Sequence, residues 1–284
     1  MTAVNAPPPI AVPEPVPQLL RDLIHERTGL FFEPDRFATM LEKLQGRAAA
    51  HGCQSYLDFY YILKYGENND AEWRRVMDAF SVQETYFWRE FDQIRALVDV
   101  VVPEWFKRNT TPLRIWSAAC ATGEEPYTIV MALHEAGWGS HPIDVCASDA
   151  SEAAIEKARA GIYRERSFRV LPPGLRPRYF RPVAGGWEIN RDIADRVRFQ
   201  RANLVVPAEI ADFASARAVF CRNVFIYFST AAIRRVAASF AARMPAKGHL
   251  FIGASESLLK VSPDFELTEI NQAFVYRRGA VPRP

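Results

Sequence analysis

The segment 117–127 reads Ser-Ala-Ala-Cys-Ala-Thr-Gly-Glu-Glu-Pro-Tyr and joins an apolar run to a helical pattern. Its small residues allow a ligand to approach the backbone closely. A dinucleotide site would show G-x-G-x-x-G, because backbone amides must cradle a pyrophosphate. Here Gly123 stands alone, and Glu124 and Glu125 occupy the place of the phosphate and would repel it. A nucleotide without phosphates fits better, and S-adenosylmethionine is the common one. A strand–helix turn that binds nothing is the alternative.

Polar residues also follow two other apolar runs. Asp149 comes after the run 143–147, where it could bind ribose hydroxyls or cap the helix that begins near Ser151. Arg222 and Asn223 follow the run 218–221, and Asn223 could bond an adenine or an amino-acid group. Tyr227 could direct its hydroxyl into the same crevice or be a half-buried aromatic residue.

These positions need a parallel sheet to bring them together. Apolar runs at 113–117, 143–147 and 218–221 alternate with helical patterns after Pro126, at 151–160 and at 230–244, which predicts an α/β fold. The runs 250–253 and 273–277 are expected as closing strands. Short alternating runs at 178–180, 187–189 and 197–199 predict a small antiparallel insertion over about 176–202.

The N-terminal third has a different pattern. The leader 1–17 is proline-rich, and we expect it to be an extended, mobile tail. Helical spacing predicts three short helices within 19–65, a fourth over 70–81, and another from Phe91 that ends before Pro103. The predicted domains are the leader 1–17, a helical domain 18–82, a linker with a connecting helix 83–110, and an α/β domain 111–284.

Composition excludes several classes of protein. With 49% hydrophobic and 24% charged residues among 284, the chain is typical of a globular protein. Lys and Arg number 35 against 33 Asp and Glu, so a net charge of +2 argues against general binding of nucleic acid. The 4 cysteines are far apart and predict neither a metal site nor disulfides. Without a long apolar segment, we expect a cytoplasmic protein that does not insert into a membrane.

Several segments together resemble the CheR family, the chemotaxis receptor methyltransferases that use S-adenosylmethionine to methylate glutamate side chains. The resemblance covers residues from about 19 to 276, in the family's order. It rests on the segments 114–127, 147–149, 156–163, 178–180, 203–204, 220–228 and 253–257. It implies a small all-helical N-terminal domain followed by a Rossmann-like class I methyltransferase domain with a small antiparallel β insertion.

The resemblance also assigns site residues. Cofactor contacts carry over to a set spread along the chain: Gln83, Thr85, Arg89, Glu125, Asp149, Asn203, Leu204, Arg222 and Asn223. Gln83 stands where the family has asparagine. A glutamate acceptor is already ionised at neutral pH, so transfer of the methyl group needs no general base. We therefore expect Arg89 and Tyr227 to orient the reacting groups, with S-adenosylhomocysteine as the product.

The expected partner is the cytoplasmic helical domain of a methyl-accepting chemoreceptor, met by a monomeric enzyme. Arg36, Lys43 and Arg47 share one helix face and are the candidate docking residues. The alternative is that these three residues form an ordinary solvent-exposed helix face without a partner. The loop at 184–186 is short, so we expect no binding of a receptor's C-terminal tethering peptide. The alternatives are a non-catalytic scaffold that binds the cofactor and a nicotinamide-dependent oxidoreductase, which the single-glycine turn disfavours.

Overall fold

The computed structural model describes residues 10–67 and 69–279. The chain divides after Ser81 into a smaller helical unit and a larger unit that begins at Val82. The segment 83–110, expected as a linker and connecting helix, is part of the larger unit.

The helical unit is built from four α-helices and one 3₁₀ turn in its described part. These are α1 (Val16–Thr28), η1 (Pro34–Arg36), α2 (Phe37–Ala50), α3 (Tyr56–Tyr65) and α4 (Asp70–Phe80). Helix α3 begins at a capping box, in which Ser55 accepts from the Asp58 amide and Asp58 accepts from the Ser55 amide. The apolar faces of the helices meet in one core that includes Leu20, Met40 and Phe59.

The prediction of a mobile leader is wrong for its C-terminal half. Ala11 bridges to Ser55, donating to Gln54 O at 3.1 Å and accepting from Tyr56 N at 2.9 Å. Val16, already in α1, is buried. These backbone bonds and the buried valine anchor the segment despite its prolines. Residues 1–9, on which the rest of the prediction falls, lie outside the described residues.

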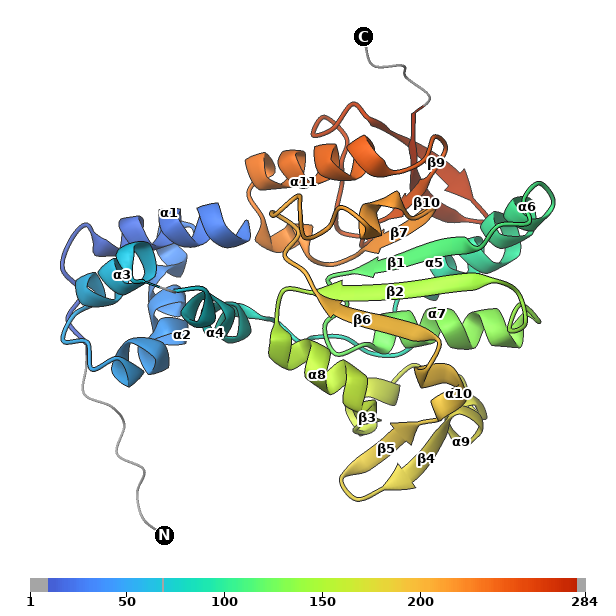
Figure 1. Cartoon of the computed structure of the whole chain (residues 1–284), viewed down its shortest axis with the longest axis horizontal. Helices are drawn as coiled ribbons and strands as arrows, with labels where there is room; N and C mark the ends of the chain where they lie inside the picture. Colours follow the sequence, from blue (N-terminus) through green and yellow to red (C-terminus); the bar gives the residue numbers. More distant parts are fainter. Residues whose placement is uncertain (1–9, 68, 280–284) are drawn as a thin grey trace. The chain divides into compact units, whose positions relative to one another are not determined.

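The larger unit has a seven-stranded sheet in the order β6-β2-β1-β7-β8-β10-β9 (Figure 1). Strands β6, β2, β1, β7 and β8 are parallel, and β10 and β9 close the sheet antiparallel. The strand bounds are β1 (Leu113–Ala118), β2 (Ile143–Asp149), β6 (Val197–Arg201), β7 (Ala218–Cys221), β8 (His249–Phe251), β9 (Phe265–Ile270) and β10 (Ala273–Arg278). The α/β fold class is as predicted, while β9 was not expected.

Helices cover both faces of this sheet. Ile115 of β1 faces the core that packs under α5 (Phe91–Ala96), η2 (Leu97–Val101), α7 (Glu124–Glu135) and α8 (Glu152–Ala160). Trp116, the next residue, faces the second core under α11 (Thr230–Arg243) and η4 (Phe213–Ser215). Figure 1 shows α7 and α11 on opposite sides of the sheet. Strands buried on both faces explain the continuous apolar runs in the sequence.

Two details differ from the predicted elements. The helix from Phe91 does not end before Pro103, because a π-helical turn, η2, leads directly into α6 (Val102–Phe106). A proline near the start of a helical turn loses no intrahelical hydrogen bond there. Residues 197–199 are not part of the small antiparallel sheet: β6 pairs parallel with β2 in the main sheet.

The antiparallel insertion itself is present. Its three strands are β3 (Ile162–Tyr163), β5 (Gly186–Ile189) and β4 (Phe180–Val183), with β5 in the middle. Short helical turns flank it: η3 (Glu165–Phe168), α9 (Leu175–Tyr179) and α10 (Arg191–Ala194). Residues 178–179 are therefore helical, and the third strand comes from 162–163 instead of 197–199.

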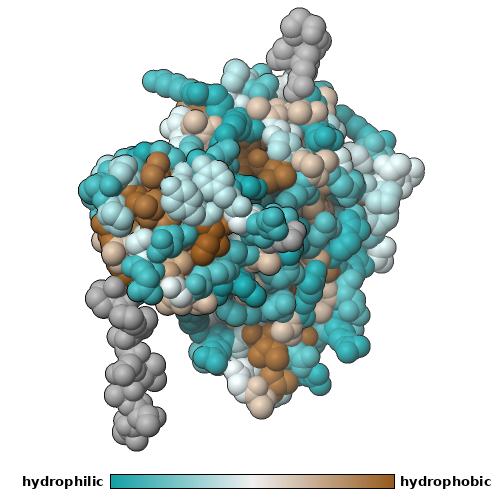
Figure 2. All heavy atoms as spheres, turned by 60° about the vertical axis from the view of Figure 1, so that its left-hand side comes forward, coloured by the Kyte–Doolittle hydropathy of each residue, from teal (hydrophilic) through white to brown (hydrophobic). Residues whose placement is uncertain are grey.

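Hydrophilic side chains dominate the face shown in Figure 2, with small hydrophobic patches between them. This is the ordinary surface of a globular protein. Within residues 10–67 and 69–279, none of the helices has the length and apolar character that a membrane span requires.

Candidate functional site

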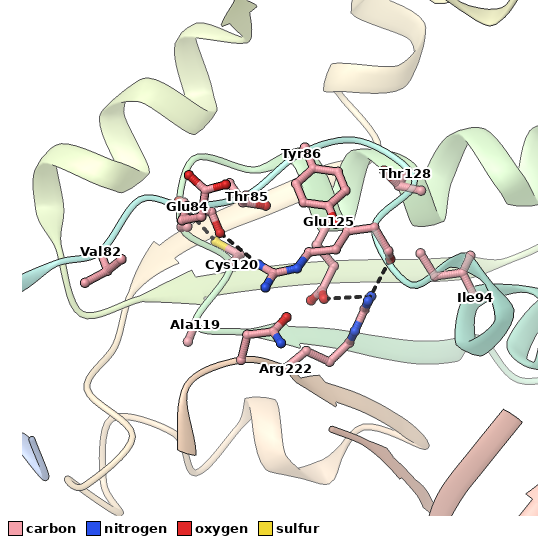
Figure 3. Close-up of a pocket in the computed structure, with 13 residues that line it drawn as sticks. Val82, Glu84, Thr85, Tyr86, Ile94, Ala119, Cys120, Glu125, Thr128 and Arg222 are labelled. Carbon is pink, nitrogen blue, oxygen red and sulfur yellow. Dashed lines mark hydrogen bonds and ion pairs between the residues drawn. The ribbon is translucent and has the colours of Figure 1, made fainter. Parts of the chain in front are cut away.

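A cavity lies at the carboxyl edge of the parallel strands, where β1 and β7 end (Figure 3). On the sheet side its wall is formed by Ala119, Cys120 and Ala121 after β1 and by Arg222 and Asn223 after β7. The opposite wall includes Glu84, Thr85, Tyr86 and Arg89 of the segment 83–89, which we call the strap. Ends of neighbouring parallel strands meet at one edge, and such edges are where open α/β sheets bind ligands.

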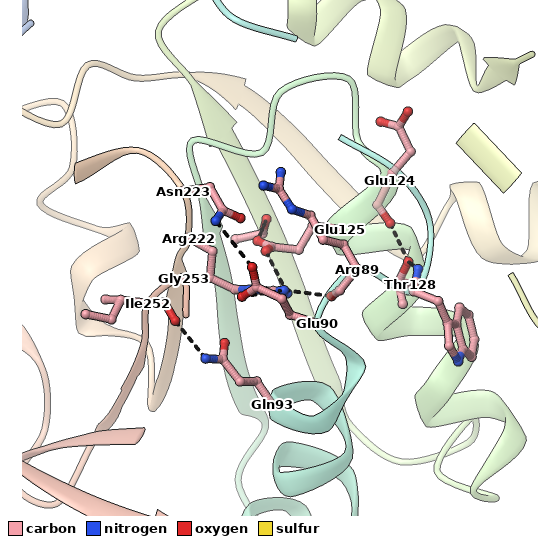
Figure 4. A network of polar contacts seen from close by, with 12 residues as sticks. Arg89, Glu90, Gln93, Glu124, Glu125, Thr128, Arg222, Asn223, Ile252 and Gly253 are labelled. Atoms are coloured by element: carbon pink, nitrogen blue, oxygen red, sulfur yellow. Dashed lines mark hydrogen bonds and ion pairs between the residues drawn. The ribbon is translucent and has the colours of Figure 1, made fainter. Parts of the chain in front are cut away.

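A buried charge network underlies the cavity. The Arg222 side chain is 2% exposed and lies 3.2 Å from Glu125 and 3.4 Å from Glu90 (Figure 4). It also donates to the Arg89 carbonyl oxygen at 2.6 Å, and Ser117 donates to Glu125 at 2.7 Å. Burial raises the pKa of Glu125, and the Arg222 charge opposes that rise. The cavity floor is therefore polar, with its opposite charges paired.

The turn after β1 is shaped by its single glycine and by Asp149. A Cβ on Gly123 would lie 2.9 Å from the Ala158 Cβ, so only glycine lets the turn pack against α8. The Asp149 carboxylate accepts from the amides of Ala121 and Ser151, each at 2.9 Å. Ser151 caps α8 with its own side chain. Asp149 therefore stabilises the cavity turn instead of acting as the helix cap.

The prediction that both glutamates of this turn face the ligand is wrong for Glu124. Its side chain is buried and accepts from Thr122 at 2.7 Å and from Ser167 at 3.0 Å, away from the cavity (Figure 4). Burial raises its pKa. The reason is helical geometry: adjacent residues of α7 point about 100° apart, so Glu125 lines the cavity while Glu124 turns inward.

Left-handed backbone conformations are concentrated around the cavity. Non-glycine residues with positive φ in its walls or beside them are Trp88, Glu90, Ala119, Ala121 and Asn223. Such conformations cost on the order of 1 kcal/mol each and persist where surrounding contacts impose them. Their clustering here is typical of a functional site.

Arg89 lies across the cavity. Its guanidinium donates to the Glu84 carbonyl oxygen at 2.8 Å and its Cζ is 5.5 Å from the Tyr86 ring centroid. The cavity volume is about 50 Å³, which is space for a few water molecules. The Arg89 side chain occupies part of the space that a nucleoside-sized ligand needs. Thr85 also lines the cavity, whereas Gln83 is bound to Lys157 at 2.7 Å.

Two acidic residues without an assigned role in the sequence analysis hold the site together. Glu256 accepts from the amides of Gly253 at 2.6 Å, Asn223 at 2.8 Å and Ile226 at 3.3 Å. Glu90 accepts from the Asn223 side chain at 3.3 Å and from Ala254 N at 3.2 Å. In the sequence, Glu256 could have been found because it lies in the segment 253–257, which resembles the family. For Glu90, the sequence offers no indication except that it follows Arg89.

Five predicted site residues lie outside the cavity lining: Gln83 and Asp149, described above, and Asn203, Leu204 and Tyr227. Leu204 is buried in the core under α11, and Asn203, also buried, accepts from the Val205 amide at 3.2 Å. Tyr227 is 38% exposed and lies in η5 (Phe225–Tyr227), in the loop that follows Asn223. Glu256 fixes that loop through Ile226 N. The structure thus gathers Thr85, Arg89, Glu125, Arg222 and Asn223 around the cavity and leaves the other five outside its lining.

The predicted docking residues are largely engaged within the helical unit. Arg47 makes two hydrogen bonds to Glu72, at 2.8 and 2.6 Å, and Glu72 is 5% exposed. Lys43 donates to the Ala79 carbonyl oxygen at 3.3 Å. Arg36 lies in η1, before α2 begins. Arg47 is therefore better explained as the partner of a buried carboxylate than as a free cation on a docking face.

Comparison with known proteins identifies the family. The sequence profile described as "CheR methyltransferase, SAM binding domain" matches residues 83–274, and the profile "CheR methyltransferase, all-alpha domain" matches residues 18–81. The chain belongs to the CheR methyltransferase family. S-adenosylmethionine is accordingly the cofactor of its larger unit, as the turn after β1 and the family resemblance predicted.

Individual CheR relatives match over most of the chain. "Chemotaxis protein methyltransferase 2" of Vibrio cholerae is 33% identical over 90% of this chain and 90% of the relative. "Chemotaxis protein methyltransferase" of Klebsiella aerogenes is 33% identical over 87% of this chain and 85% of the relative. "Probable biofilm formation methyltransferase WspC" of Pseudomonas aeruginosa is 35% identical over 78% of this chain and 52% of the relative.

The cavity residues fit S-adenosylmethionine chemically. The amino-acid end of the cofactor carries an ammonium and a carboxylate, and the cavity offers Glu125 and the Arg89 guanidinium. The Asp149 carboxylate, on the turn beside the cavity, is a hydrogen-bond acceptor, which is what ribose hydroxyls require. The Nε of Arg222 is buried without a hydrogen-bond partner among the described residues. Together these groups can donate hydrogen bonds to the cofactor and accept hydrogen bonds from it.

Proposed function

We propose that this CheR protein transfers the methyl group of S-adenosylmethionine to glutamate side chains of a chemoreceptor or a related sensor. The products are a glutamate methyl ester and S-adenosylhomocysteine. The finer parts of this proposal, the glutamate acceptor and the receptor, are supported by the names of the chemotaxis relatives and by the chemistry of the cavity.

The observation that carries the proposal is the kind of side chain in the cavity: among the described residues, its lining has charged groups that can orient a ligand but no group suited to proton transfer. Among its charged groups, Glu125 is paired with Arg222. The one thiol in its lining, Cys120, is buried, and burial raises its pKa well above the ordinary range, so it stays protonated and unreactive. No histidine is present among the described residues that line it. An ionised carboxylate acceptor needs neither a general base nor a nucleophilic residue.

When bound, S-adenosylmethionine supplies an electrophilic methyl group on a sulfonium. The role of the protein is alignment and exclusion of water, and well-oriented reactants can gain on the order of 7 to 11 kcal/mol. We assign Arg89, whose guanidinium already spans the cavity, and Tyr227, whose loop follows the cavity residue Asn223, to orient the reacting groups. Glu256 holds that loop at Ile226.

The proposed partner is the cytoplasmic helical domain of the receptor, met by a monomer in the cytoplasm. Lys43 and Arg47 have internal partners, so the contact made by the helical unit is proposed to depend on Arg36 and on fewer cations than the sequence indicated. The loop between β4 and β5 contains only Ala184 and Gly185, and no binding of a tethering peptide is proposed. Measurable affinity for such a peptide would overturn that point.

Cofactor binding is tested first. Calorimetric titration with S-adenosylhomocysteine is expected to show micromolar binding, and NADH, the control, none. Binding of the product without any methyl transfer to receptors would favour the second candidate, a scaffold that binds the cofactor. The observation that favours a scaffold is the contact of the Gln83 side-chain amide with Lys157, which turns this amide toward α8.

The transfer is tested with labelled methyl donor and the signalling domains of receptors from the same organism. Label that is released as methanol in mild alkali identifies an ester, and label that resists alkali would exclude the glutamate acceptor. Tyr227→Phe and Arg89→Ala are each expected to reduce turnover about 100-fold or more. If both variants keep full turnover and unchanged cofactor affinity, the assignment of these two residues falls.

A further inference from the structure

Arg169 contacts the strap from outside the cavity. Its Nη2 lies 2.7 Å from Glu84 Oε1, and its Cζ lies 3.7 Å from the centroid of the Tyr86 ring. Glu84 and Tyr86 both line the cavity, whereas Arg169 does not. The ion pair lowers the pKa of Glu84, so the carboxylate is charged at neutral pH. The Arg169 side chain therefore binds two residues of the cavity wall.

The strap depends on such contacts because its own backbone is irregular. Residues 81–86 form neither helix nor strand. Further support comes from Phe87 N, which donates to Ser167 O at 2.9 Å, and from Lys157, which donates to Gln83. A segment held by a few polar contacts is locally less stable than a core element. Loss of one contact is expected to shift the position of the strap.

The contact of Arg169 is transmitted to the cavity through Glu84. The carbonyl oxygen of Glu84 accepts from the Arg89 guanidinium, while its carboxylate is paired with Arg169. The position of Glu84 therefore determines where Arg89 is anchored. The Tyr86 ring contacts both guanidinium groups, with the Arg89 Cζ 5.5 Å and the Arg169 Cζ 3.7 Å from its centroid.

We propose that Arg169 is a positioning residue for cofactor binding: its contacts with Glu84 and Tyr86 hold the strap in the place where it closes on S-adenosylmethionine. Arg169 acts through the strap and does not touch the cofactor. The inference rests on the proposed function of the cavity and adds a residue to it that neither the sequence motifs nor the cavity lining contains.

Replacement of Arg169 by alanine removes both contacts. The ion pair is partly exposed, with side chains 41% and 57% exposed, and the cation–π contact is close. Together they are expected to weaken binding of S-adenosylhomocysteine about three- to ten-fold. The KM for S-adenosylmethionine rises by the same factor, and kcat changes less than about two-fold. Arg169→Lys keeps the charge and is expected to recover part of the affinity.

Ionic strength gives a readout that a merely structural role would not move. Salt screens an exposed ion pair, so the affinity of the wild type for S-adenosylhomocysteine falls between low and high salt more steeply than that of Arg169→Ala. Glu84→Gln removes the ion pair alone and is expected to weaken binding about two- to three-fold. It tests the proposal even if Arg169→Ala fails to fold.

Arg176 provides a matched control in the same unit. It pairs with Glu165 at 2.7 Å and its Cζ lies 4.5 Å from the Trp187 ring, but none of these residues lines the cavity. Arg176→Ala is expected to bind S-adenosylhomocysteine like the wild type. The inference is overturned if Arg169→Ala also binds like the wild type, or if the two arginine variants lose affinity equally. If the wild type itself does not bind, the proposed function fails and the inference falls with it.

Discussion

Removal of Arg222 is expected to destabilise the larger unit strongly. Arg222→Met deletes the cation between Glu125 and Glu90, whose side chains are only 15% and 27% exposed. Breaking a buried ion pair by removal of one partner costs about 3 to 5 kcal/mol, because the other charge is left uncompensated. The bond from Arg222 to the Arg89 carbonyl oxygen is lost as well. We expect a total loss within the same range, since the terms are not additive.

Urea unfolding followed by tryptophan fluorescence measures this loss. Trp88, Trp105, Trp116, Trp138 and Trp187 lie in the larger unit and Trp73 alone in the helical one, so the signal reports mainly on the larger unit. Adding Glu125→Gln to Arg222→Met is expected to restore part of the stability, because one unpaired charge is then removed. Without Arg222 the pKa of Glu125 rises further, so the penalty is smaller at pH 5 than at pH 8.

Arg114→Met is the control. Arg114 pairs with Asp212 at 2.9 Å and lies 3.6 Å from Asp144 and 2.6 Å from Ser215, but the Asp212 side chain is 76% exposed. An exposed pair contributes about 0 to 1 kcal/mol, so this variant should unfold almost like the wild type. The reasoning is refuted if Arg222→Met unfolds within about 1 kcal/mol of the wild type, or if Arg114→Met is destabilised as much.

Three further predictions concern other parts of the chain. Burial and two nearby arginines lower the pKa of His249 to about 4 from 6.5, so below pH 6.5 the unfolded chain binds a proton that the native state does not. The free energy of unfolding should therefore fall by about 2 kcal/mol between pH 8 and pH 5, and His249→Gln should reduce this pH dependence, as measured by urea midpoints. A Cβ on Gly253 would lie 2.5 Å from the Asn223 Nδ2, so Gly253→Ala should cost about 1 to 3 kcal/mol and weaken binding of S-adenosylhomocysteine in calorimetry, whereas Gly46→Ala, with nothing within 4 Å, should do neither. Glu72→Gln should lower the stability of the helical unit by about 1 to 3 kcal/mol in melts followed by circular dichroism, and an unchanged melting temperature would show that the Arg47 pair contributes nothing.

Much of the fold and part of the site could be predicted from the sequence. Apolar runs of strand length alternating with helical spacing determine a parallel α/β sheet, because strands buried on both faces must be apolar throughout. Ends of parallel strands share one edge, so Glu125 and the residues after β7 were expected to meet, and they line one cavity. The family resemblance placed Thr85 and Arg89 in the same site.

The rest was decided by tertiary structure. The alternating runs 180–183, 186–189 and 197–201 look alike in the sequence, yet 197–201 pairs with β2, because partners and register depend on which strand edge is available. Contacts between segments far apart in the chain join Glu90 and Glu256 to the site and bring Arg169 against its strap. Helical spacing placed Arg47 on a surface face, but a buried carboxylate 25 residues away pairs with it. Charges are assigned to partners by three-dimensional proximity, which local spacing does not contain.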